Sequence, residues 1–128
     1  MFKPISAYSG FTVDYLPQAQ RFYEETLGCE TEERTGGMKI NLPGHNVIWA
    51  YPKDDHKPPA FTILNFVVSD IDEAVDELVA RGVTFVYYEG MPIQQDEKGI
   101  LRGRAAHKGP DIAWFKDPAG NTLAVLQS

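Results

Sequence analysis

The sequence predicts an α+β fold made of two similar halves, each with the element order strand, helix and three strands. Two amphipathic helical stretches occupy matching places along the chain, and each lies between β-rich stretches. A polar, proline-rich stretch at residues 52–60 separates the halves and is typical of a linker. A chain of 128 residues can build a real core. We therefore expect a single domain, with module one at about residues 1–52 and module two at about residues 61–128.

The first half begins with a β-rich stretch at residues 5–13. Apolar residues then recur at helical spacing over residues 16–27, which predicts a helix. Pro17 suits the first turn of this helix, and Gly28 suits its C-terminal end. Strands are predicted next at residues 29–34, 38–42 and 47–51, with glycine- and proline-containing turns between them.

The second half repeats this order, starting with a predicted strand at residues 61–68. Asp70 is placed to cap the following helix, and Glu73 gives an arrangement close to a capping box. Gly82 is placed to end the helix. Strands are predicted after it at residues 83–88, 112–116 and 122–127. Neither half could bury its sheet alone, so we expect the halves to pack together.

Three stretches of the sequence resemble a known family. They read GFTVDYLPQAQRFYEETLG, LNFVVSDIDEAVDELVARGV and WFKDPAGNTLAVLQ, and the last is a hairpin with a dense run of turn formers. They are similar to the vicinal oxygen chelate superfamily, which contains glyoxalases, extradiol dioxygenases and bleomycin-resistance proteins. The resemblance covers nearly the whole chain apart from about residues 89–109. It implies two βαβββ modules whose curled mixed sheets surround a shared cavity.

The resemblance also implies a metal site that this chain does not fit. Enzymes of the family hold a divalent metal with His or Glu from the first and last strands of each module. The metal polarises a carbonyl or activates bound water or dioxygen. The matching positions here are Tyr8, Trp49, Ile63 and Ala124. A neutral phenol is a poor ligand and the other three side chains cannot coordinate a metal, so we expect no metal and no cofactor.

Strand alternation predicts which other residues share the cavity side with these four positions. They are Thr12, Tyr51, Asn65 and Trp114. Aromatic walls with a few polar groups are typical of a small-molecule pocket, and the rings could stack a planar ligand. The alternative is that the aromatic rings fill a closed core. The alternate residues of these strands should point the other way, toward the helices. They are Phe11, Val13, Leu64, Phe66, Val68, Leu123 and Val125.

A long polar connection at residues 89–109 is typical of a binding loop or lid. We place Arg104 and His107 among the ligand contacts because either could meet an anionic group at the mouth of the pocket. A solvated loop without a contact role is the alternative. Glu89 could act as a base, but no partner can be named for it, so no catalytic residue is assigned.

Composition and charge limit the partners. The net charge of −6 argues against nucleic acid, which favours basic surfaces. No apolar run reaches membrane length, and no signal peptide opens the chain. The single cysteine, Cys29, cannot form an intramolecular disulfide, so we expect a reducing, cytoplasmic setting. The three histidines share no short ligand spacing and are expected to be isolated on the surface.

These observations predict a metal-free protein that binds a small, partly aromatic molecule by burial and stacking, as bleomycin-resistance members do with drugs. The resemblance implies a homodimer. One alternative is a lyase or dioxygenase of glyoxalase type with an atypical site, in which Tyr8 acts as acid or base. The other is a non-catalytic interaction module whose cavity has closed.

Overall fold

The computed structural model describes all 128 residues and has the α+β class that the sequence predicts. The chain divides into two compact units, Met1–Pro58 and Pro59–Ser128, and each is described by itself. The division falls inside the proline-rich stretch at residues 52–60. None of the helices has the length and apolar character that crossing a membrane requires.

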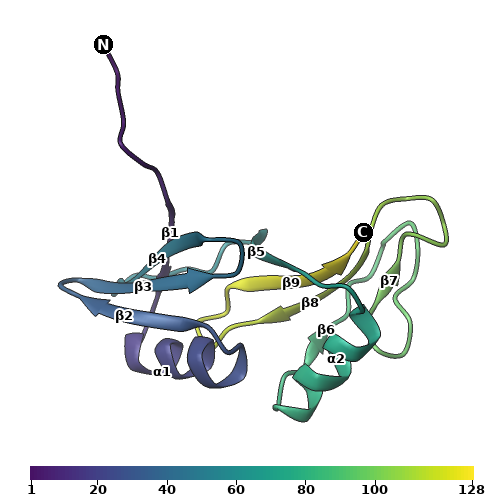
Figure 1. The fold of residues 1–128 in the computed structure, drawn as a ribbon. Coiled ribbons are helices and arrows are strands. Elements are labelled where there is room, and N and C mark those ends of the chain that lie inside the picture. Colours follow the sequence, from purple (N-terminus) through teal and green to yellow (C-terminus); the bar gives the residue numbers. More distant parts are fainter. The chain divides into compact units, whose positions relative to one another are not determined.

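The first unit contains one four-stranded sheet (Figure 1). Its order is β1 (Ser9–Val13), β4 (Asn46–Pro52), β3 (Gly37–Leu42) and β2 (Glu30–Arg34), with β1 parallel to β4 and the other neighbours antiparallel. Strands β2, β3 and β4 lie close to their predicted bounds. The first strand is shorter than the predicted β-rich stretch at residues 5–13, because no residue of β4 before Ile48 pairs with it. Tyr8 therefore precedes β1, and 66% of its surface is exposed.

Helix α1 (Leu16–Arg21) continues directly into a π-helical turn at Phe22–Thr26. Together they match the predicted helix, and Pro17 lies in the first turn. Gly28 ends the helix as expected, with a φ of 72° that favours glycine and an N–H that donates to the Glu24 carbonyl at 3.1 Å. Tyr23 in the π-helical turn is fully buried, with its ring centroid 5.8 Å from that of Phe11. The helical segment therefore contributes to the core on the Phe11 face of the sheet.

The second unit contains a five-stranded sheet. The strand order is β5 (Thr62–Val67), β9 (Thr122–Gln127), β8 (Asp111–Lys116) and β6 (Phe85–Val86). Strand β7 (Leu101–Arg102) also pairs with β8. Strand β5 is parallel to β9, and the other pairs are antiparallel. Strands β8 and β9 confirm the hairpin. Strand β7 was not predicted.

The predicted strand at residues 83–88 shrinks to the two residues of β6. The physical reason is a side chain that takes the place of a strand partner. Gln95 Nε2 donates to the Val86 carbonyl at 2.9 Å, and Gln95 Oε1 accepts from the Tyr88 N–H at 2.7 Å. The backbone after Val86 thus bonds to the loop that follows it, so the ladder with β8 does not continue.

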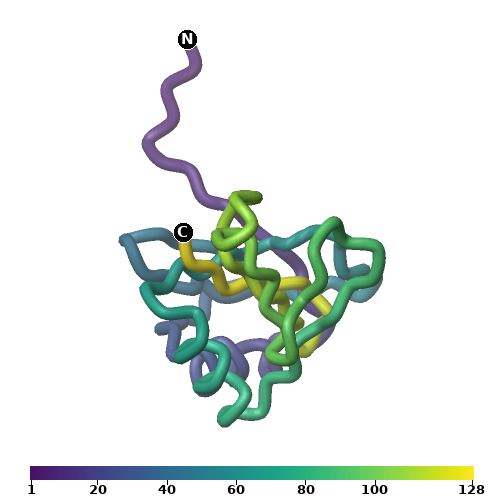
Figure 2. The backbone as a smooth tube through the Cα atoms, turned by 90° about the vertical axis from the view of Figure 1, so that its right-hand side faces the viewer, coloured from purple at the N-terminus to yellow at the C-terminus, as the bar shows by residue number.

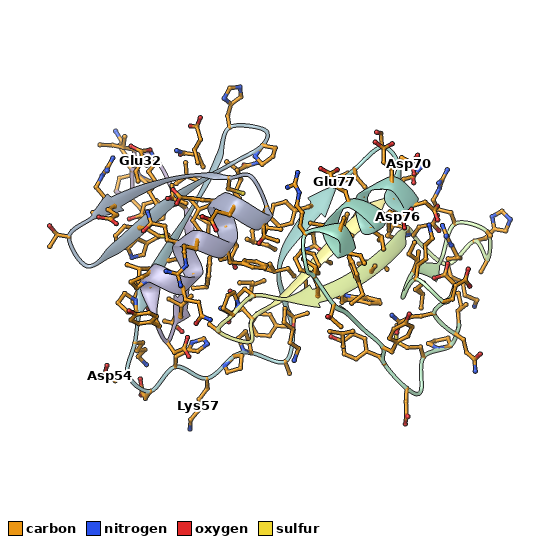
Figure 3. All side chains as sticks on the ribbon, turned by 90° about the horizontal axis from the view of Figure 1, so that it is seen from below. Glu32, Asp54, Lys57, Asp70, Asp76 and Glu77 are labelled. Atoms are coloured by element: carbon orange, nitrogen blue, oxygen red, sulfur yellow. The ribbon has the colours of Figure 1, made fainter.

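Helix α2 (Ile71–Ala80) begins as the sequence predicts. The Asp70 side chain accepts from the Glu73 N–H at 3.1 Å, and Gln127 Oε1 accepts from the Ile71 N–H at 3.0 Å. Ile71 and Val75 are buried, whereas Asp70 and the two acidic residues Asp76 and Glu77 on the outer side of the helix are exposed (Figure 3). An apolar face toward the sheet and an acidic face toward solvent make α2 an amphipathic surface helix.

Most of the predicted helix-facing residues form the core. Phe11, Val13, Leu123 and Val125 are buried. Leu64, Phe66 and Val68 are only partly buried, because they belong to or adjoin β5, an edge strand of its sheet.

Candidate functional site

The sheet of the first unit presents Trp49 on the face opposite its core. Trp49 pairs with Gly10 on β1 and with Lys39 on β3. Thr12 pairs with Tyr51 in the same β1–β4 ladder, and both share the Trp49 face because alternate residues of a strand point the same way. Three of the four site residues predicted in this unit, Thr12, Trp49 and Tyr51, therefore lie on one face.

Two glycines leave the Trp49 ring room to extend along the sheet. A Cβ atom built on Gly37 would lie 2.7 Å from Cζ2 and 3.0 Å from Cη2 of Trp49. A Cβ atom on Gly10 would lie 3.8 Å from Cδ1 at the other end of the ring system. The indole thus passes over the sheet surface from β4 toward Gly37 instead of standing away from it. It offers an extended apolar ring in a half-buried position.

A polar pair that the sequence does not reveal involves Thr12, which shares the sheet face with Trp49. Thr12 Oγ1 is 2.6 Å from His56 Nδ1. A turn brings His56 back to β1: the Lys53 N–H donates to the Val13 carbonyl at 2.9 Å, and the His56 N–H donates to the Lys53 carbonyl at 3.0 Å. The expectation that His56 is isolated is therefore wrong. The contact spans 44 positions of sequence, so no local pattern could have indicated it.

Charged residues continue the Trp49 face on β2 and β3. Glu32, labelled in Figure 3, pairs in register with Lys39. Its carboxylate accepts hydrogen bonds from Asn41 Nδ2 at 2.9 Å and from Arg34 Nη2 at 2.7 Å, and it lies 3.5 Å from Lys39 Nζ. The hydrogen bonds from Asn41 and Arg34, together with the charge of Lys39, hold the pKa of Glu32 at about 2. In the first unit the predicted site residues came only from the first and last strands, so the charged residues of β2 and β3 were missed.

In the second unit, three predicted site residues form a row across the sheet. Asn65 on β5 pairs with Ala124 on β9, and Ala124 pairs with Trp114 on β8. Ladder partners lie on the same face, so the three side chains share it. Ile63 differs because the register of β5 and β9 shifts between Thr62 and Leu64, which puts Ile63 in a bulge.

An aromatic neighbour extends this row. The Tyr88 ring meets Trp114 edge to face, with the ring centroids 5.4 Å apart and an interplanar angle of 85°. Ala124 is fully buried and contributes only a methyl group. This face can therefore offer stacking and one amide, from Asn65, but no metal-binding group from the last strand.

The turn at residues 117–121 fixes the start of β9. Asp117 Oδ1 accepts from the backbone N–H groups of Ala119 and Asn121, each at 2.9 Å. Asp117 Oδ2 accepts from Asn121 Nδ2 at 3.0 Å. Only 4% of Asp117 and 0% of Asn121 is exposed, so this hydrogen-bonded network is buried. It sets the register that brings Ala124 opposite its partners.

The connection from β6 to β8 makes two separate excursions, green and yellow-green in Figure 2, and the segment between them is tied to α2. Arg102 Nη1 and Nη2 donate to the two carboxylate oxygens of Asp72 at 3.0 and 2.7 Å. Arg102 Nε donates to Asp96 Oδ2 at 2.9 Å. Asp96 Oδ1 also accepts from the backbone N–H groups of Lys98 and Ile100. One guanidinium therefore joins the loop to the first turn of α2.

The two predicted loop contacts lie in the second excursion. Arg104 is exposed, its N–H donates to Asp111 Oδ1 at 3.1 Å, and its Nη1 lies 3.6 Å from Asp111 Oδ2. His107 is exposed and has a φ of 54°. Asp111, which is buried, thus holds the start of this excursion and partly balances the Arg104 charge.

The Arg102–Asp72 pair gives a testable pH dependence. The hydrogen bond from Arg102, assisted by the charges of Arg102 and Lys98, holds the pKa of Asp72 at about 2, below its ordinary value of 3.8. The pair therefore contributes stability above the unfolded-state pKa, and this contribution is lost as the pH falls toward 2. Carboxyl NMR should place the Asp72 midpoint near pH 2, and Arg102→Gln should move it up toward 3.8.

A matched control for this titration is Arg81→Gln. Arg81 pairs with Glu77 at 2.6 Å on the same helix, so its loss should leave the Asp72 midpoint where it was. An Asp72 midpoint near its ordinary value in the unmodified protein would mean that the pair does not hold the loop in solution.

The side chains at the family's ligand positions do not fit a divalent metal. The phenol of Tyr8 precedes β1, the indole of Trp49 lies on β4, the branched hydrocarbon chain of Ile63 lies in the β5 bulge and the methyl group of Ala124 lies on β9. Within either unit, no three His, Cys, Asp or Glu side chains come together in an arrangement that could hold a metal ion.

Comparisons with known proteins agree with this fold. The sequence model of the Glyoxalase/Bleomycin resistance protein/Dioxygenase superfamily matches residues 6–125. The sequence matches no curated protein at a significant level. A member of the same superfamily from Sphaerobacter thermophilus is similar in structure, with a TM-score of 0.64, 25% identity, and coverage of 97% of this chain and 98% of that one.

Two further solved structures have the same fold. The fosfomycin resistance protein FosX from Listeria monocytogenes has a TM-score of 0.67 at 14% identity, with coverage of 100% of this chain and 95% of its own. TnmS3, an antibiotic binding protein from Streptomyces sp. CB03234, has a TM-score of 0.64 at 20% identity, with coverage of 98% of each chain. At these identities the likeness concerns the fold alone.

Proposed function

Because this chain belongs to the Glyoxalase/Bleomycin resistance protein/Dioxygenase superfamily, we propose that it binds a small, partly aromatic molecule without a metal. The observation that carries this proposal is the Trp49 ring extended along the sheet between Gly10 and Gly37. Aromatic rings stack on planar ligands, and each such pair adds about 0.5–1.5 kcal/mol beyond the burial of its area. The Thr12–His56 pair, in which Thr12 shares the sheet face with Trp49, supports recognition of a ligand with a hydrogen-bonding group.

The proposed ligand contacts comprise the predicted residues on the face of each unit, Tyr8 before β1, Ile63 in the β5 bulge, and two loop residues for an anionic group. They are Tyr8, Thr12, Trp49, Tyr51, Ile63, Asn65, Trp114, Ala124, Arg104 and His107. FosX is a fosfomycin resistance protein, and TnmS3 is an antibiotic binding protein. The proposal extends the binding of a small, drug-like molecule to the present chain.

We also propose a homodimer in a reducing, cytoplasmic setting. Phe2, Ile5 and Tyr8 are exposed on the extended segment before β1, purple in Figures 1 and 2, and this apolar surface supports contact with a second copy. Cys29 is the single cysteine and forms no disulfide, which supports a reducing compartment. Light scattering across a range of concentrations tests the dimer.

Thermal unfolding with a panel of planar drugs and aromatic metabolites tests the binding function. A true ligand at 100 times its dissociation constant should add about 2.7 kcal/mol to the free energy of unfolding. Trp49→Ala should abolish that gain, because the stacking surface is removed. Tyr15→Ala, which removes an exposed ring before α1, is the matched control and should keep the gain.

Three outcomes would contradict the proposed function. One is a panel in which no compound stabilises the protein. Another is a ligand whose effect survives Trp49→Ala unchanged. The third is one equivalent of a divalent metal that co-purifies with the protein and resists dialysis, as measured by elemental analysis.

A further inference from the structure

The first loop after β6 forms a pocket that the proposed function does not use. Its volume is about 310 Å³, near the lower end of the range for small-molecule sites. Every lining residue belongs to one stretch of the second unit, from Tyr87 to Gln95. The side chains that matter for recognition are Tyr87, Tyr88, Glu89, Met91 and Ile93.

The two tyrosine walls are held in place by contacts of their own. Tyr87 Oη donates to the Glu97 carbonyl at 2.7 Å. The Tyr88 ring rests edge to face on Trp114, and the Tyr88 N–H donates to Gln95 Oε1. These contacts fix both rings without a ligand, so little ordering is needed when a ligand enters.

Gln95 closes the base of this loop. Its Nε2 donates to the carbonyls of Val86 at 2.9 Å and Gly99 at 2.7 Å. With its oxygen accepting from Tyr88, the amide joins three backbone positions around the pocket. Gln95 therefore gives the pocket its shape, and its amide is engaged in holding the loop.

The lining of the pocket carries a negative charge and no positive one. Glu89 is the only Asp, Glu, Lys, Arg or His among the lining residues, and it is exposed. A carboxylate attracts a cation, and the faces of tyrosine rings do the same. Met91 and Ile93 add apolar contact. This combination favours a ligand that is small, flat and positively charged.

We propose that the pocket at residues 87–95 binds a small planar organic cation, such as an aromatic amidinium or ammonium. Glu89 supplies the opposite charge, and Tyr87 and Tyr88 supply the aromatic part of the lining. The lining of this pocket lies wholly in one loop of the second unit and includes none of the ligand contacts proposed above. Because Tyr88 touches Trp114, a ligand here should change the fluorescence of Trp114.

The test compares benzamidinium with its neutral analogue benzamide, using the full chain. Trp49→Phe leaves Trp114 as the only tryptophan, since the sequence has two. Benzamidinium should change the Trp114 emission to saturation, and benzamide should bind at least about tenfold more weakly. In the same background, Glu89→Gln should weaken benzamidinium binding by about three- to tenfold and leave benzamide unaffected.

Glu97→Gln is the matched control for charge. It removes the same formal charge from the same connection, but Glu97 does not line the pocket and uses only its backbone carbonyl to hold Tyr87. Benzamidinium binding should therefore change by less than about twofold in this variant. If Glu89→Gln and Glu97→Gln weaken benzamidinium binding equally, the loss of affinity comes from the change in net charge and not from a contact with Glu89. That result would overturn the proposal.

Two other results would also overturn it. One is the absence of a saturable change with millimolar benzamidinium. The other is benzamidinium binding that Glu89→Gln leaves intact but Trp49→Ala removes, which would place the cation on the Trp49 face. Failure of the Trp49 ligand screen alone leaves the loop-pocket measurement unaffected, so the two proposals fail separately.

Discussion

Replacing Asp117 by alanine should lower the free energy of unfolding by about 3–5 kcal/mol, because each buried donor left without an acceptor costs about 1–3 kcal/mol. Three donors lose their hydrogen bond to Asp117 at once: the N–H groups of Ala119 and Asn121 and the Asn121 side-chain amide. Only 4% of Asp117 is exposed, so water can replace its carboxylate only if the turn opens. Urea unfolding followed by circular dichroism gives the change.

Two substitutions calibrate this result. Asp117→Asn keeps one oxygen for the two backbone donors but turns an NH₂ group toward the Asn121 amide, so its loss should be intermediate. Pro118→Ala alters an exposed residue of the same turn and should cost less than about 1 kcal/mol. A loss below about 1 kcal/mol for Asp117→Ala would mean that the buried network does not form in solution.

Features with local causes could be predicted from the sequence. The capping of α2 by Asp70 depends on residues three positions apart, and the end of the α1 segment depends on one glycine. The turn at residues 117–121 is stabilised by its own first and last residues. Because each of these contacts closes within a few residues, composition and spacing were enough to place the elements.

Features that depend on contacts far apart in sequence could not be predicted. The Thr12–His56 contact closes a long loop, and Lys39 meets Trp49 only because β3 pairs with β4. The ladder between β6 and β8 ends early because Gln95, a residue of the following loop, takes the backbone partners. Side chains that replace a strand leave no periodic pattern, so alternation alone overestimates the length of this strand.

The face of the first unit that carries Trp49 depends on a missing side chain, and Gly37→Ala tests this. A Cβ atom at Gly37 would lie 2.5 Å from the Ala50 carbonyl oxygen and 2.7 Å from Trp49 Cζ2. The first of these atoms is backbone in a paired strand, so it cannot move without disturbing the β3–β4 ladder. We expect the free energy of unfolding to fall by about 2–3 kcal/mol, the cost typical of overpacking.

Gly10→Ala is the matched control on the other side of Trp49. Its Cβ atom would meet the Trp49 carbonyl at 3.4 Å and Cδ1 at 3.8 Å, which are ordinary van der Waals distances, so stability should change by less than about 0.5 kcal/mol. Gly37→Ala should also shift the Trp49 emission, measured with Trp114→Phe in the background, because the indole must leave its place over β3. If the two alanine variants are equally stable and emit alike, the ring does not lie over Gly37. The stacking surface proposed for the ligand would then have no structural basis.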